Sequence, residues 1–195
     1  SSLFGFFGRV NYNWRDMLFV SASIRREAST KFGVNSRWGN FPSASIAWEM
    51  MEASFMDSAG EVVKSLKPRF SFGVTGREPG SSYQSLATYS TKYQYFMDGE
   101  WVTGYAPSNN ANPLLSWEKS VSYNIGVDFD LWNRLRGSVE YYIRQSPDLL
   151  YNYTAPQPPY VYNTILVNVG TTTNRGIEVC LNADVIKKKN FTWNS

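Results

Sequence analysis

The 195-residue sequence contains no histidine, a single cysteine and no long apolar run. The absence of histidine excludes Ser-His-Asp and Cys-His catalysis within this segment and removes the commonest metal ligand. The single cysteine, Cys180, allows no disulfide within the chain. No stretch approaches the roughly 18 consecutive apolar residues that a membrane-spanning helix needs. We therefore expect no enzyme activity and no helical membrane anchor in these residues.

Signals for phosphate and nucleic-acid binding are also lacking. Gly73, Gly76 and Gly80 match no phosphate-loop spacing. The net charge of +3 comes from 19 basic and 16 acidic residues scattered along the chain. The one basic run, at 187–189, falls in a predicted tight turn, and a solvated turn explains it better than a nucleic-acid patch. We expect neither a cofactor nor a nucleic-acid partner.

The sequence does contain apolar residues at every second position in one segment after another. The clearest case alternates Val121, Tyr123, Ile125, Val127 and Phe129 with Ser122, Asn124, Gly126 and Asp128. Because strand side chains point alternately to opposite faces, this segment is predicted to be a strand with one apolar and one polar face. Such alternation is typical of antiparallel sheets with one solvated face.

Six further segments show the same alternation, which predicts seven complete strands and the start of an eighth at Phe191. They lie at 4–14, 18–24, 44–50, 70–74, 135–143 and 177–185. The longest segments, at 4–14, 121–129, 135–143 and 177–185, run nine to eleven residues, whereas strands of soluble sheets average about five or six. A tilted strand that crosses a bilayer needs about nine to eleven residues. The predicted fold class is therefore all-β, an antiparallel transmembrane β-barrel segment of about seven to eight strands.

Aromatic residues make up 16% of the chain, including 13 tyrosines and 7 tryptophans. Tyrosine and tryptophan favour membrane interfaces because each combines an apolar body with a polar tip. Several lie near predicted strand ends, where they are expected to form an aromatic girdle: Tyr12, Trp14, Trp48, Trp117 and Trp132.

Short and long connections alternate along the chain, as they do between the periplasmic turns and extracellular loops of outer-membrane barrels. Short turns are predicted at Arg15-Asp16, around Asn133 and at 187–190, and long loops at 29–40, 77–116 and 148–173. The segment 52–66 is long although it falls on the periplasmic side. Its apolar residues predict a short amphipathic helix under the wall: Phe55, Met56, Val62 and Val63.

Five ordered motifs resemble the SusC-type TonB-dependent outer-membrane transporters of Bacteroidetes, the SusC/RagA family. They are FGRVNYNW at 7–14, RWGNFPSASIAWEM at 37–50, SFGVTG at 71–76, NPLLSWEKSVSYNIGVDF at 112–129 and NVGTTTNRGIEVCLNADV at 168–185. The chain departs from the family pattern at Arg26-Glu27-Ala28 and at Arg77-Glu78, both at predicted loop edges.

This resemblance implies that residues 1–195 are about a third of a barrel of about 22 strands with a plugged lumen. The plug domain and the N-terminal region that contacts TonB would lie outside this excerpt of a longer polypeptide. The family implies the Gram-negative outer membrane and the import of a nutrient, typically an oligosaccharide or another ligand such as a peptide. The implied partners are outer-membrane lipid, a SusD-like surface lipoprotein and TonB.

Aromatic and amide side chains in the two longest loops are the candidate substrate-binding residues. Flat rings can stack on sugar faces while amides bond hydroxyl groups. The loop at 77–116 contributes Tyr93, Tyr95, Trp101, Tyr105, Asn109 and Asn110, and the loop at 148–173 contributes Tyr151, Tyr153, Tyr160 and Tyr162. The alternative is that these rings belong to the interfacial girdle or pack the loops on themselves.

Charged residues on the polar faces of the predicted strands would line the lumen. They are Arg9, Arg25, Arg136, Glu140 and Arg144, which would either tune the passage or form ion pairs with the plug or within the wall. Two other functions remain open at this stage. One is a soluble all-β carbohydrate-binding or adhesive module, and the other is a passive porin.

Overall fold

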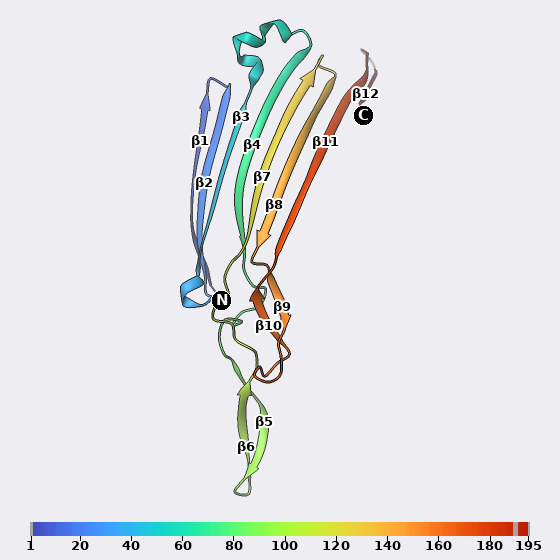
Figure 1. The fold of residues 1–195 in the computed structure, drawn as a ribbon. Helices are drawn as coiled ribbons and strands as arrows, with labels where there is room; N and C mark the ends of the chain where they lie inside the picture. The colour runs from blue at the N-terminus through green and yellow to red at the C-terminus, as the bar shows by residue number, and fades with distance from the viewer. Residues whose placement is uncertain (1, 189–190, 195) are drawn as a thin grey trace.

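The computed structural model describes residues 2–188 and 191–194. The chain forms one eight-stranded antiparallel sheet with two small hairpins at one end (Figure 1). In spatial order the strands are β1 (Leu3–Trp14), β2 (Leu18–Ser29), β3 (Trp38–Trp48), β4 (Val63–Arg77), β7 (Glu118–Leu131), β8 (Leu135–Pro147), β11 (Thr171–Lys188) and β12 (Phe191–Asn194). The predicted strands, including the eighth at Phe191, are confirmed.

The strand register places the alternating residues on two chemically different faces. One row of residues that lie opposite one another across seven strands consists of Tyr12, Val20, Ile46, Phe70, Ile125, Tyr141 and Ile177. The described residues leave this apolar face uncovered, since Ile125 remains 58% exposed and Ile177 70% exposed. The opposite, polar face carries serine, asparagine and charged residues, and Cys180 lies there as predicted.

Two tight turns match the sequence prediction. Arg15 and Asp16 have φ angles of 54° and 53°, and Trp132 and Asn133 both have 55°. Positive φ at both central residues is the geometry of a type I′ turn, whose twist matches that of the flanking strands. The side chain of Asn13 also donates a 2.6 Å hydrogen bond to Asp16. The third predicted turn includes residues 189–190, which lie outside the described residues.

The connection between β3 and β4 is not the predicted amphipathic helix. It contains two short 3₁₀ helices, Met50–Glu52 and Ser54–Ala59, and Val63 already belongs to β4. The carboxylate of Glu49 accepts hydrogen bonds from the Ser65 hydroxyl at 2.9 Å and the Leu66 N–H at 3.2 Å. These bonds tie the end of β3 to the first residues of β4, and Phe55 is 62% exposed.

The three long connections gather at the opposite end of the sheet, where the N-terminus also lies (Figure 1). The β4–β7 connection forms the hairpin of β5 (Tyr89–Met97) and β6 (Glu100–Pro107), which projects beyond the other loops. The β8–β11 connection forms the hairpin of β9 (Leu150–Thr154) and β10 (Thr164–Asn168). None of the described helices is long and apolar enough to cross a membrane.

Candidate functional site: the polar face and the loop end

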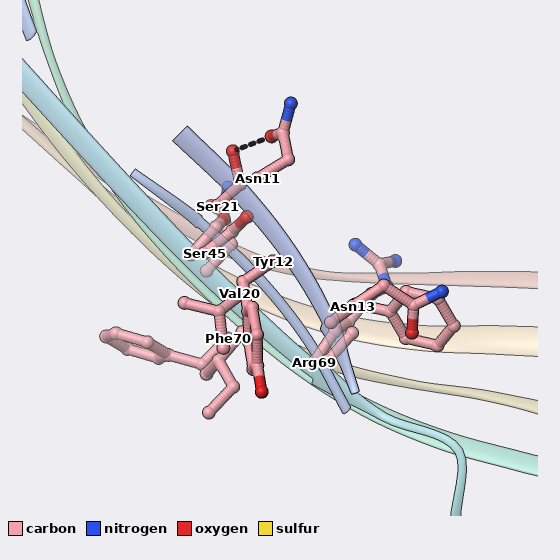
Figure 2. Close-up of a pocket in the computed structure, with 13 residues that line it drawn as sticks. Asn11, Tyr12, Asn13, Val20, Ser21, Ser45, Arg69 and Phe70 are labelled. Atoms are coloured by element: carbon pink, nitrogen blue, oxygen red, sulfur yellow. Dashed lines mark hydrogen bonds between the residues drawn. The ribbon is translucent and has the colours of Figure 1, made fainter. Parts of the chain in front are cut away.

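Small hydroxyl and amide side chains form a hydrogen-bonded surface along the centre of the polar face. The Ser21 hydroxyl donates to Asn11 at 2.8 Å, and the Asn124 amide donates to Ser71 at 3.2 Å. They line a groove of about 420 Å³, and Figure 2 shows Asn11 and Ser21 on one side of the sheet and Val20 and Phe70 on the other. This surface can offer donors and acceptors to a polar occupant.

Several charged side chains on the polar face form ion pairs with other strands of the wall. Arg69 lies 2.7 Å from Glu140 on β8 and 3.2 Å from Asp128 on β7. Its guanidinium crosses β7 at Gly126, where an added Cβ would lie 3.3 Å from the Arg69 Cζ. Arg136 pairs with Asp130 at 3.0 Å. Of the alternatives left open by the sequence, Glu140 and Arg136 therefore show ion pairs within the wall, Arg136 with the adjacent strand β7 and Glu140 with Arg69 of β4, across β7.

The other three predicted lumen residues have different environments. The guanidinium of Arg9 lies over the Phe7 ring, and that of Arg25 lies over the Phe41 ring and 3.4 Å from Glu27. Arg144 lines two grooves of about 410 and 530 Å³ on the polar face. Among the described side chains no carboxylate pairs with Arg144, so its charge is available to a ligand or to another part of the protein.

A small apolar core packs the loops together at the end of the sheet. Phe32, Phe41, Leu115 and Trp117 are each at most 5% exposed, and Leu150 of β9 packs against them. The prediction that Trp117 anchors the membrane girdle is wrong. Its ring packs 4.9 Å from Phe32 and 5.3 Å from Phe41, and its indole N–H donates to the Arg37 carbonyl at 3.0 Å. Trp14 and Trp132, by contrast, are exposed at the turn end of the sheet, as a girdle requires.

Asparagine side chains join the second and third long loops. Asn110 donates to the Tyr162 and Thr164 carbonyls at 2.6 and 2.9 Å, and its oxygen accepts the Tyr162 N–H. Asn168 makes two bonds to the Ser116 backbone, at 2.8 and 2.9 Å. The amide of Asn109 is likewise engaged with its own loop. The two asparagines proposed as ligand contacts thus bond the loops to themselves in this structure.

A partly buried ion pair joins the long loops at 29–40 and 77–116. Lys31 donates to Glu78 at 2.7 Å and to the Pro79 carbonyl at 2.9 Å, and the Ser29 hydroxyl donates to Glu78 at 2.6 Å. Burial raises the pKa of Glu78, but the hydrogen bonds from Lys31 and Ser29 and the positive charge of Lys31 outweigh it, so the net pKa is lowered. Ser29 is only 1% exposed, which makes this contact a fixed part of the loop assembly.

The candidate aromatic residues fall on three separate surfaces. On the β5–β6 hairpin, the register puts Tyr93 and Tyr95 on one face and Trp101 on the other, beside Phe96 at 5.4 Å. Tyr105, on β6, is 74% exposed. On β9, Tyr151 and Tyr153 share one exposed face.

The remaining two tyrosines lie in the connection between β9 and β10. Tyr160 is 41% exposed, whereas Tyr162 donates its hydroxyl to the Pro107 carbonyl at 2.9 Å. The ten candidates therefore do not form one site.

Sequence reasoning missed the residues that hold the loops in place. Phe32, Leu115, Asn112 and Asn168 show no periodic pattern, because their partners lie in other loops. The one available signal was the segment 112–117, Asn-Pro-Leu-Leu-Ser-Trp, in which apolar residues stand next to an asparagine and a proline.

Comparisons with known proteins agree with this architecture. The family model described as "TonB dependent receptor-like, beta-barrel" matches residues 1–195. TonB-dependent receptor P39 of Formosa agariphila is 37% identical over 98% of this chain and 18% of its own length. TonB-dependent receptor SusC of Bacteroides thetaiotaomicron is 32% identical over 99% of this chain and 20% of its own length. The chain thus spans about a fifth of these relatives.

Solved structures show the same relationship. The structure of the RagAB peptide transporter superposes with a TM-score of 0.84 at 27% identity, covering 96% of this chain and 20% of that one. The siderophore receptor PirA of Pseudomonas aeruginosa, at 16% identity and a TM-score of 0.61, supports the fold alone. Together these matches identify the sheet as part of a TonB-dependent receptor barrel and not as a soluble module.

The apolar face is then the lipid-facing surface in the Gram-negative outer membrane, and the polar face lines the barrel lumen. The long loops lie on the extracellular side and the tight turns on the periplasmic side. The whole-chain family match, the sheet and the similarity to SusC and RagAB show that this chain belongs to the TonB-dependent receptor family, as a segment of its β-barrel.

Proposed function

We propose that the whole protein imports a nutrient across the outer membrane with energy delivered through TonB. In this proposal residues 1–195 form barrel wall and extracellular mouth and perform no bond chemistry. The observation that supports it best is the combination of a continuous lipid-facing surface with a polar lumen face on which no described carboxylate pairs with Arg144. A transport lumen needs such polar groups, whereas a packed soluble core would exclude them.

The test is growth of cells that lack the gene, with and without the full-length protein supplied again, on defined oligosaccharides and peptides as nutrient sources. We expect one group of nutrients to support growth only when the protein is present. Growth that is independent of the protein on every nutrient would contradict an import role.

Tyr151 and Tyr153 are the best-placed side chains for substrate, which we propose is an oligosaccharide. They are 60% and 54% exposed on one face of β9–β10. The other face of this hairpin is anchored, because Leu150 and Leu166 pack against the loop core. An anchored pair of exposed rings loses little conformational entropy when it stacks on sugar.

This assignment predicts that Tyr151→Ala with Tyr153→Ala weakens oligosaccharide binding to the full-length protein by at least tenfold in calorimetry. Tyr93→Ala with Tyr95→Ala is the matched control and leaves the affinity within about twofold. Tight peptide binding and no oligosaccharide binding would instead support a peptide substrate, the kind named for the RagAB transporter.

The projecting β5–β6 hairpin is proposed as a contact for a SusD-like surface lipoprotein. Both of its faces expose large apolar or aromatic side chains, including Tyr95 at 50%, Phe96 at 61% and Trp101 at 69%. Exposed apolar surface of this kind marks interaction sites, and an isolated two-stranded hairpin is only marginally stable in water. We expect Phe96→Ser with Trp101→Ser to reduce co-purification of the lipoprotein, while the yield of folded barrel extracted in detergent stays normal. Unchanged co-purification would contradict this contact.

A further inference from the structure

Charged side chains divide unequally between the two faces of the eight-stranded sheet. Among the described residues of its strands, every carboxylate occupies a polar-face position. They are Glu27, Glu118, Asp128, Asp130, Glu140, Glu178 and Asp184. The lumen face therefore holds the negative charge of the wall.

On the loop half of the lipid-facing surface, the charged side chains of the described strand residues are all cations. The register places Arg26 opposite Phe6, Lys119 opposite Gly76 and Arg175 opposite Ile143, all on the apolar face. The three side chains are exposed, and within the part of the chain that the structure describes no carboxylate pairs with any of them. Three basic residues thus stand on a surface that otherwise faces lipid.

All three lie near the extracellular ends of their strands. Arg26 is three residues before the end of β2 at Ser29, Lys119 is the second residue of β7, and Arg175 is the fifth of β11. From Leu18 to Arg26 a tilted strand rises about 20 Å, at about 3.4 Å per residue and a tilt of about 40°. Because the apolar band of such barrels is about 25 Å tall, Arg26 lies close to its outer edge.

Arg26 has a defined aromatic setting. Its guanidinium lies 4.8 Å from the centroid of the Trp38 ring, and the ring of Phe6 is parallel to Trp38 within 4° at 6.5 Å. Trp38 remains 46% exposed and Phe6 61% exposed, so both rings also face the membrane. A cation held over an indole at the interface is positioned without being neutralised.

We propose that Arg26, Lys119 and Arg175 bind the phosphate groups of anionic lipids in the outer leaflet. Arg26 on β2 and Arg175 on β11 are separated by five strand spacings, about 24 Å, so the three cations contact more than one lipid molecule. Guanidinium and ammonium groups are the usual protein ligands of phosphate, and the apolar rows below them are positioned to contact the acyl chains of the same lipids. A phosphorylated lipid satisfies both the cations and the apolar surface. A soluble anion would satisfy the cations alone.

The test uses the purified full-length protein and native mass spectrometry with diphosphorylated lipid A as the probe. The same lipid with its phosphates removed and inorganic phosphate are the two comparison ligands. A cation near an anionic lipid surface contributes about 1 kcal/mol, which corresponds to about a fivefold change in affinity. We expect Arg26→Gln, Lys119→Gln and Arg175→Gln together to weaken lipid A binding by about fivefold for each of these cations that a bound lipid contacts.

A matched triple variant on the lumen face, Arg9→Gln with Lys67→Gln and Arg144→Gln, removes the same numbers of arginine and lysine charges. It is expected to change lipid A binding by less than about threefold. Equal binding of the phosphorylated and dephosphorylated lipids would overturn the proposal, and this comparison needs no variant. Binding of inorganic phosphate as tight as that of lipid A would also overturn it, since it would indicate a simple anion site.

Discussion

An arginine at the centre of β7 should be tolerated on one face of the wall and not on the other. Ile125 and Asn124 are adjacent residues near the middle of the strand, which runs from Glu118 to Leu131. Ile125 lies on the apolar face between Phe70 and Tyr141, and Asn124 lies on the polar face. The two substitutions Ile125→Arg and Asn124→Arg therefore introduce the same side chain at the same depth.

The expected cost of Ile125→Arg is about 2–4 kcal/mol, the range for a basic residue on the lipid side at the bilayer midplane. The midplane is about 12 Å from either edge of an apolar band about 25 Å tall, so the guanidinium cannot easily reach the interface. At Asn124 the new side chain enters the polar groove and replaces one hydrogen bond to Ser71, which costs about 1 kcal/mol.

The assay is urea titration of the full-length protein folded in lipid vesicles, with the folded fraction followed by gel mobility of unheated samples. The difference in unfolding free energy between the two variants should be at least about 1 kcal/mol, with Ile125→Arg the less stable. Equal losses for both variants, or a larger loss for Asn124→Arg, would refute the assignment of faces.

Three further predictions concern the ion pairs and the loops. A double-mutant cycle with Arg69→Met and Glu140→Gln in the same titration should give a coupling free energy of about 1 kcal/mol, and additive effects would rule out the ion pair. The lowered pKa of Glu78 means that its contribution to stability is complete above its usual value of 4.5 and is lost as pH falls through the lowered pKa. Proteolysis of the loops should therefore accelerate at acid pH, and Glu78→Gln should be cleaved faster already at pH 7 and show a smaller acid increment. Asn168→Ala removes both bonds to Ser116 and should lower hydrogen-exchange protection of the loops by about 1–3 kcal/mol, with protection of β7 unchanged.

The presence of the strands and the sheet face of each of their side chains could be predicted from the sequence, because period-two alternation is a local signal. The segment around Ile125 is an example, since its apolar residues all face one way in the structure. The residue at which β4 begins was harder to predict from the sequence. Pro68, which cannot donate a hydrogen bond to a neighbouring strand, lies within this strand, and a register shift between Val63 and Ser65 breaks the alternation at Lys64.

The loop end could not be predicted, because its contacts join residues far apart in the sequence. Trp117 looked like a girdle residue from its position at a strand end, yet Phe32 of the β2–β3 connection and Phe41 of β3 pack against its ring. Asn110 likewise looked free for a ligand, and only the tertiary structure brings the Tyr162 and Thr164 carbonyls to its amide. Exposed tyrosines such as Tyr151 remain predictions as ligand contacts.

The most direct test of the proposed import is the energy dependence of nutrient accumulation by cells that carry the full-length protein. Uptake of the nutrient identified by the growth assay is measured with TonB present, with TonB deleted and with the proton gradient collapsed. We expect accumulation inside the outer membrane only in the energised cells with TonB, while surface binding persists in all three. Accumulation at equal rates without TonB would show passive diffusion through the barrel and contradict the proposed mechanism.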